Sequence, residues 1–87
     1  MRLVIIPEDK VVGKDGLFFH NLDFSSVDIP SNVRVLQWNE KGDERGHLEF
    51  KDNTIFNEDI DVLPAWANDC VALWETAKSS LPEGPVL

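Results

Sequence analysis

The spacing of the hydrophobic residues changes near Leu63, and this change constrains the fold more than any other feature of the sequence. Before it, apolar side chains tend to recur at every second position, as in residues 33–38, which is typical of half-buried strands. After it, the spacing of three and four residues is typical of an amphipathic helix. The apolar positions there are Leu63, Trp66, Ala67, Cys70, Leu73, Trp74, Ala77 and Leu81. The sequence therefore predicts an α+β fold, with a sheet followed by one C-terminal helix.

The ends of this helix are marked by residues with known positional preferences. Pro64 suits the first turn, where its missing N–H would be unpaired in any case. Ser79 and Ser80, followed by Pro82 and Gly84, indicate where the helix ends. We expect its apolar face to pack on the sheet through Leu63, Trp66, Cys70, Leu73, Trp74 and Ala77.

The strand-forming runs predict a small antiparallel meander of four or five strands. They are residues 3–6, 10–12, 17–19, 33–38 and 48–50, and residues 54–56 could form one more short strand. Gly13 to Gly16 form a hairpin signal, Asn39 to Gly46 form a polar turn, and Asp52 with Asn53 offers another turn.

Between the first three strands and the fourth lies a polar segment, residues 20–32, that carries regularly placed apolar residues. These are Leu22, Phe24, Val27 and Ile29. A disordered linker would not need them, so we expect a loop whose apolar side chains enter the core.

The length of 87 residues predicts one domain, residues 1–81, followed by a short flexible tail, residues 82–87. A domain of this size buries only about 60 to 65 % of the surface of its unfolded chain, so association with a partner is plausible. Cys70 is the single cysteine, which rules out an intrachain disulfide. Pro7 ends the first apolar run, so we expect neither a signal peptide nor a membrane segment.

The chain carries 16 acidic and 8 basic residues, a formal charge of -8. This charge repels nucleic-acid phosphates, so we expect no direct binding to DNA or RNA. An acidic surface complements a basic protein or imitates DNA, although a merely solvated surface has the same composition.

No residue pattern predicts catalysis or metal binding. Cys70 lies on the apolar helix stripe, where a cysteine behaves as a small hydrophobe rather than as a nucleophile. His20 and His47 do not show a metal-ligand spacing. We therefore expect no enzymatic activity, no cofactor and no metal ion.

The acidic residues near the helix start raise the separate question of a calcium site. Asp52, Glu58, Asp59 and Asp61 lack the central glycine and the register of a calcium-binding loop. Negative charge near the positive end of the helix dipole explains them better.

The aromatic residues supply the candidates for protein recognition. Trp66 and Trp74 are predicted to lie in the core, whereas Trp38 precedes the polar turn of the second hairpin. If the side chain of Trp38 points outward, it is a natural anchor for a partner. The predicted protein-binding residues are accordingly Trp38, Asn39 and Glu40.

Several motifs, in this order, resemble a known group of proteins: RLVIIPEDK, GLFFHNLDFSSVDIPSNVRVLQWNEKG, HLEF, NEDI and ALWETAK. The chain resembles small proteins encoded among the tail and tail-fibre genes of tailed bacteriophages and prophages. The resemblance spans residues 2–78 and carries over no catalytic residues. It implies a minor virion component, or a chaperone or adaptor, associated with tail fibres.

Two functions therefore remain open at this point. The first is a structural or assembly protein that binds a tail-fibre or baseplate subunit, located in the virion or in the host cytoplasm, with self-association possible. The alternative is an acidic inhibitor directed at a host protein, such as a DNA mimic or an anti-defence protein.

Overall fold

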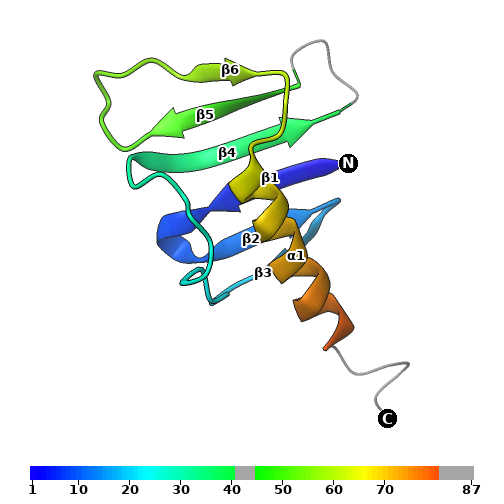
Figure 1. Ribbon diagram of the computed structural model, residues 1–87. Helices are drawn as coiled ribbons and strands as arrows, with labels where there is room; N and C mark the ends of the chain where they lie inside the picture. Colours follow the sequence, from blue (N-terminus) through cyan, green and yellow to red (C-terminus); the bar gives the residue numbers. More distant parts are fainter. Residues whose placement is uncertain (41–44, 81–87) are drawn as a thin grey trace.

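The computed structural model describes residues 1–40 and 45–80, which form a six-stranded antiparallel sheet with one α-helix across it (Figure 1). The strands are β1 (Arg2–Ile6), β2 (Val11–Lys14), β3 (Leu17–Phe19), β4 (Val33–Asn39), β5 (Gly46–Phe50) and β6 (Glu58–Ile60). The helix is α1 (Ala65–Ser79), and a short 3-10 helix, η1 (Pro7–Asp9), joins β1 to β2. The predicted α+β fold is confirmed, although the sheet has six strands rather than four or five. The predicted tail, residues 82–87, lies outside the described residues.

The order of the strands in the sheet is β3-β2-β1-β4-β5-β6. The sheet is thus two three-stranded meanders placed side by side, and the antiparallel pair β1 and β4 joins them at the centre. The expectation of one simple meander is corrected in this respect. Residues 20–32 carry the chain from β3 at one edge back to β4 in the middle, and this return requires a long connection.

The hairpin predicted at Gly13 to Gly16 is present, as the antiparallel pair β2 and β3. Asp15 and Gly16 both have positive φ, 52° and 90°, as the central residues of the favoured two-residue hairpin turn do. The Asp15 side chain also accepts a hydrogen bond of 2.8 Å from the backbone N–H of Arg2. The turn therefore also holds the start of β1 in place.

Residues 54–56, which could have formed one more short strand, do not form one, because a turn occupies the start of this segment. The Asp52 carboxylate accepts hydrogen bonds from the backbone N–H and the hydroxyl of Thr54, at 2.9 and 2.7 Å. The N–H of Ile55 donates to the carbonyl of Asp52 at 3.1 Å. Such local bonds offer the backbone an alternative to a sheet ladder, and the strand forms later, as β6.

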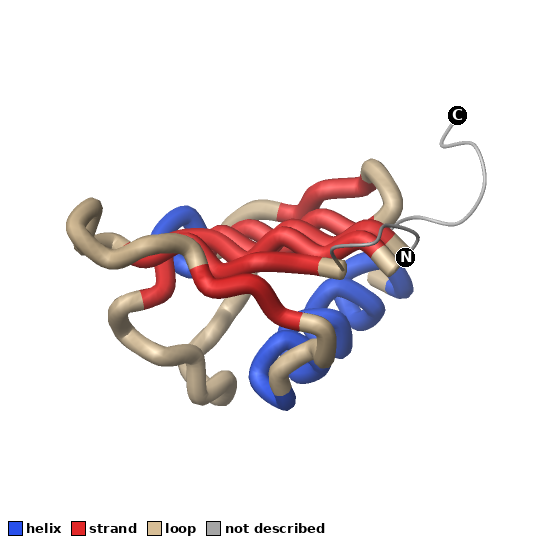
Figure 2. The backbone as a smooth tube through the Cα atoms, turned by 90° about the horizontal axis from the view of Figure 1, so that it is seen from above, coloured by secondary structure: helices blue, strands red, loops and turns tan. Residues whose placement is uncertain are grey.

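The core lies between one face of the sheet and the layer formed by α1 and residues 20–32. Figure 2 shows α1 on one side of the sheet, and the described residues place no helix over the opposite side apart from the short η1 at one end. All four predicted anchors of the loop pack against the core, as expected: Leu22, Phe24, Val27 and Ile29. Among the described residues, no helix has the length and apolar character needed to cross a membrane.

The buried face of α1 agrees with the predicted one at its centre. Ala67, Cys70 and Trp74 are buried, and Leu63 and Trp66 pack against the core while remaining partly exposed. Leu73 instead lines a hollow beside Val27 of the loop, so the helix contacts the loop as well as the sheet. Val71 also packs against the core, which the sequence pattern did not indicate.

Trp74 makes the most varied set of contacts between α1 and the sheet. Its indole N–H donates a hydrogen bond of 2.9 Å to the carbonyl of Leu17 in β3. The ring of Phe19 meets the indole edge-to-face, with 6.0 Å between ring centroids. Lys14 lies 4.8 Å from the centroid of the indole and forms a 2.8 Å ion pair with Glu75. These contacts fasten the helix to the β2–β3 hairpin.

We expect Trp74→Ala to lower the free energy of unfolding by about 3 to 5 kcal/mol, because it removes a buried aromatic side chain and leaves a cavity. Chemical denaturation monitored by circular dichroism measures this loss. Trp74→Phe is the matched variant: it keeps most of the ring but loses the bond to Leu17. Beyond the loss of ring volume, that bond contributes about 1 kcal/mol. An unchanged stability of Trp74→Ala would contradict the observed packing.

Candidate functional site

Trp38, the aromatic residue predicted to bind a partner, is a core residue. Its side chain is only 5 % exposed, and the residue is paired with buried Leu3 across β1 and β4. Its ring covers Gly46 on the neighbouring strand: a Cβ atom on Gly46 would lie 2.8 Å from Cε3 of the indole. The condition for a binding role of Trp38, an outward-facing side chain, is therefore not met, because strand alternation turns this residue toward α1.

Asn39 and Glu40, the other two predicted binding residues, lie at the exposed end of β4. The N–H of Glu40 donates to the carbonyl of Met1 at 3.2 Å, and the Glu40 carboxylate lies 3.3 Å from the amino group of Met1. Both residues are accessible, and Glu40 also fastens the start of the chain to the sheet. Residues 41–44 of the predicted polar turn lie outside the described residues.

Cys70 has the environment of a structural cysteine rather than a nucleophile. Its side chain is fully buried in the core cluster. Burial, together with the nearby charge of Asp69, raises the pKa of the Cys70 thiol to about 12. The thiolate, which is the reactive species, is therefore scarce at neutral pH. Within residues 1–40 and 45–80, no three His, Cys, Asp or Glu side chains converge as metal ligands would.

We expect Cys70 in the folded protein to resist alkylation by iodoacetamide at neutral pH, because the thiol is both buried and protonated. The same reagent should modify the thiol fully in concentrated urea. Intact-mass spectrometry over a time course measures both rates. Equal rates with and without urea would show that the helix face is wrongly placed.

The open face of the sheet, opposite α1, carries a polar cluster over β4 and β5. Its centre is Glu49, whose carboxylate accepts hydrogen bonds from Arg34 at 3.2 Å and from Gln37 at 3.4 Å. The ring nitrogen Nε2 of His47 lies 3.2 Å from the same carboxylate. The hydrogen bond with His47, and then that with Arg34, lowers the pKa of Glu49. The cluster is a cross-strand network that stabilises the sheet, without an unpaired acid or base poised for proton transfer.

The lowered pKa of Glu49 gives a pH dependence with a definite sign. Its carboxylate favours the folded state above the ordinary glutamate pKa of 4.5, and this contribution is lost as the pH falls through the lower folded-state value. We therefore expect the stability of the wild type to fall more steeply below pH 4.5 than that of Glu49→Gln. Urea titrations at a series of pH values measure both slopes, with Glu8→Gln as the control for the lost charge. Parallel slopes for the wild type and Glu49→Gln would contradict the role of the cluster.

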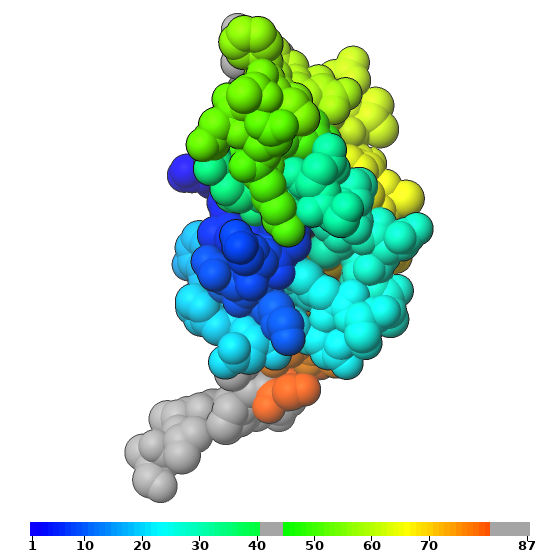
Figure 3. Space-filling model, turned by 90° about the vertical axis from the view of Figure 1, so that its left-hand side faces the viewer, coloured from blue at the N-terminus to red at the C-terminus, as the bar shows by residue number. Residues whose placement is uncertain are grey.

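The two most exposed apolar side chains of the described residues lie on either side of β6. Phe56 is 93 % exposed and Val62 is 73 % exposed, and Ile55, beside Phe56, is 45 % exposed. Figure 3 shows the green part of the chain, around β5 and the turn that follows it, at the upper part of the molecular surface. The hydrogen bonds around Asp52 order this turn, so Phe56 is presented from a defined backbone. We call the three residues Ile55, Phe56 and Val62 the apolar rim.

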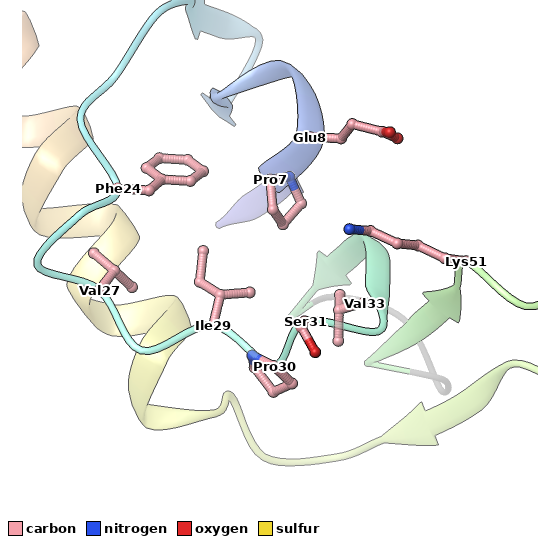
Figure 4. Close-up of a pocket in the computed structure, with 9 residues that line it drawn as sticks. All are labelled: Pro7, Glu8, Phe24, Val27, Ile29, Pro30, Ser31, Val33 and Lys51. Atoms are coloured by element: carbon pink, nitrogen blue, oxygen red, sulfur yellow. The ribbon is translucent and has the colours of Figure 1, made fainter.

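A shallow hollow of about 240 Å³ lies between η1, the loop of residues 20–32, the start of β4 and the end of β5. Phe24, Val27 and Ile29 form its floor, and Glu8 and Lys51 stand at its edge (Figure 4). The hollow has an apolar floor but lacks the converging polar groups of a substrate site. It suits a side chain of a partner better than a small polar ligand.

Sequence reasoning missed the apolar rim, because it assigned residues 54–56 to a strand. Asp52 and Asn53 were correctly expected to form a turn, but Thr54, whose N–H and hydroxyl both bond to the Asp52 carboxylate, extends this turn into the segment that could have formed a strand. Apolar residues directly after such a turn are placed at the surface.

Comparison with known proteins adds no relative of this chain. No protein-family model matches it, and neither the curated proteins nor the solved structures give a significant match. The function must therefore be argued from the surface.

Proposed function

We propose that this domain is a non-enzymatic, protein-binding component associated with the tail fibre or baseplate of a bacteriophage. The observation that carries the binding role is the apolar rim, and above all the almost complete exposure of Phe56. A phenylalanine left in water forgoes much of the free energy that its burial would contribute. A partner surface that covers it would recover that free energy. The phage context rests on the sequence motifs from Arg2 to Lys78.

The way in which Phe56 is held supports this role. The turn is closed by three hydrogen bonds to Asp52, two from Thr54 and one from Ile55. An anchor on an ordered turn loses less conformational entropy on binding than one on a flexible loop. Aromatic anchors of this kind contribute a large share of the binding energy in protein interfaces.

The alternative function, an acidic inhibitor directed at a host protein, has less support from the surface. A DNA mimic presents rows of free carboxylates, whereas several carboxylates here are paired with cations. Glu49 contacts Arg34, Glu75 contacts Lys14, and Glu40 contacts the amino group of Met1. The alternative would gain support if the protein were abundant in infected cells and absent from particles.

Two measurements test the proposal: the presence of the chain in phage particles and its binding to a fibre protein. Mass spectrometry of purified particles from the parent phage should detect the chain at a ratio near that of a tail-fibre protein. Co-purification with the fibre protein should weaken about 30-fold in Phe56→Ser, the loss of one strong anchor. Leu17→Ser, at the opposite edge of the sheet, is the control and should bind as the wild type does. Absence of the chain from particles, together with no co-purification, would overturn the proposal.

A further inference from the structure

Strand β6 is an edge of the sheet and is paired on one side only, with β5. In an edge strand, alternate N–H and C=O groups point away from the sheet and are available to another chain. Glu58 and Asp59 are both exposed, so the two carboxylates of β6 are accessible to a partner. Figure 1 shows β6 along the upper border of the sheet, away from the body of α1.

The apolar rim brackets this edge. Phe56 lies two residues before β6 and Val62 two residues after it, and both are strongly exposed. A seven-residue stretch spans up to about 20 Å when extended, which is the length of an ordinary strand. The edge thus offers backbone hydrogen bonds in the middle and apolar contacts at both ends.

The charges around β6 determine which kind of partner strand can pair with it. Three exposed acidic residues lie within or directly after it: Glu58, Asp59 and Asp61. A second copy pairing through the same edge would bring these carboxylates close to one another, and like charges across a strand pair are destabilising. A strand with lysine or arginine side chains would be attracted instead.

The opposite edge, β3, also exposes apolar side chains, those of Leu17 and Phe18, but it differs from β6 in its charge and in its free backbone groups. Its sequence, Leu17–Phe19, contains no charged residue, and the carbonyl of Leu17 already accepts the indole N–H of Trp74. It therefore has no charged side chains that would favour a strand of opposite charge, and one of its carbonyl groups is already hydrogen-bonded to α1. Of the two edges, β6 is the one suited to a basic strand.

We propose that β6 receives an extended, lysine- or arginine-rich segment of a partner protein as an additional antiparallel or parallel strand. The backbone of Glu58–Ile60 hydrogen-bonds to this segment, and Phe56 and Val62 contact its apolar side chains. The inference rests on the proposed protein-binding function and specifies the chemistry of the partner.

A random library of linear 12-residue peptides, selected on the full chain and counter-selected on Phe56→Ser, tests the proposal without knowledge of the natural partner. The surviving peptides should combine lysine or arginine with apolar residues. The best of them, as a synthetic peptide, should slow hydrogen exchange at the amides of residues 58–60. Its affinity should fall about 30-fold in Phe56→Ser, and about fivefold in Asp59→Lys at low salt.

The controls separate a local effect from a general one. Asp28→Lys makes the same charge change at an exposed position in the loop of residues 20–32 and should leave the affinity within about twofold of the wild type. Survivors without basic residues, protection at β3 in place of β6, or no survivors would each overturn the inference. A fibre protein that still binds Asp59→Lys and Val62→Ser normally would overturn it while leaving the proposed function standing.

Discussion

The hydrogen bond between the Trp74 indole and the Leu17 carbonyl determines where the helix lies on the sheet. Without it, α1 would hold to the sheet mainly through apolar contacts and one surface ion pair, and these specify position less strictly than a buried directional bond does. The edge-to-face contact with Phe19 and the ion pair between Lys14 and Glu75 surround this bond. All of them lie on the β2–β3 hairpin, so one half of the sheet carries the most specific helix contacts. The half that contains β6 is left free of them.

This asymmetry divides the molecule into a structural part and an accessible part. On the side of β3, the edge is engaged by the helix, and the core is closed by Cys70 and Trp74. On the side of β6, the edge is bordered by Phe56 and Val62, the two most exposed apolar side chains of the described residues. The charges follow the same division, because Lys14 and Lys78 lie against the indole of Trp74, whereas carboxylates border β6. A small domain can bind a partner without disturbing its core when the core contacts and the binding surface lie in different halves of the sheet.

The fold was predictable from the sequence to the extent that its local signals were unambiguous. The Asp15-Gly16 turn and the helical spacing of Cys70 and Trp74 each allow one interpretation, and both agree with the structure. Strand order was not predictable, because nothing in the local sequence states that β4 pairs with β1 rather than with β3. The orientation of Trp38 was ambiguous for a similar reason: alternation identifies two faces but does not say which one the helix covers. The apolar rim was missed because β-forming residues at positions 54–56 suggested a strand, while the side chain of Asp52 closed a turn.

The strand order also has a consequence for the way in which the chain folds. Each meander contains mostly local contacts, so each can form early, whereas the pairing of β1 with β4 joins residues more than thirty positions apart, such as Leu3 and Trp38. The closing of the loop between the two meanders is therefore the natural slow step. The docking of α1 is a second slow step, because the hydrogen bond from Trp74 to Leu17 joins residues 57 positions apart. During synthesis the helix is made last, and until α1 emerges from the ribosome only the loop of residues 20–32 can cover the apolar face of the nascent sheet.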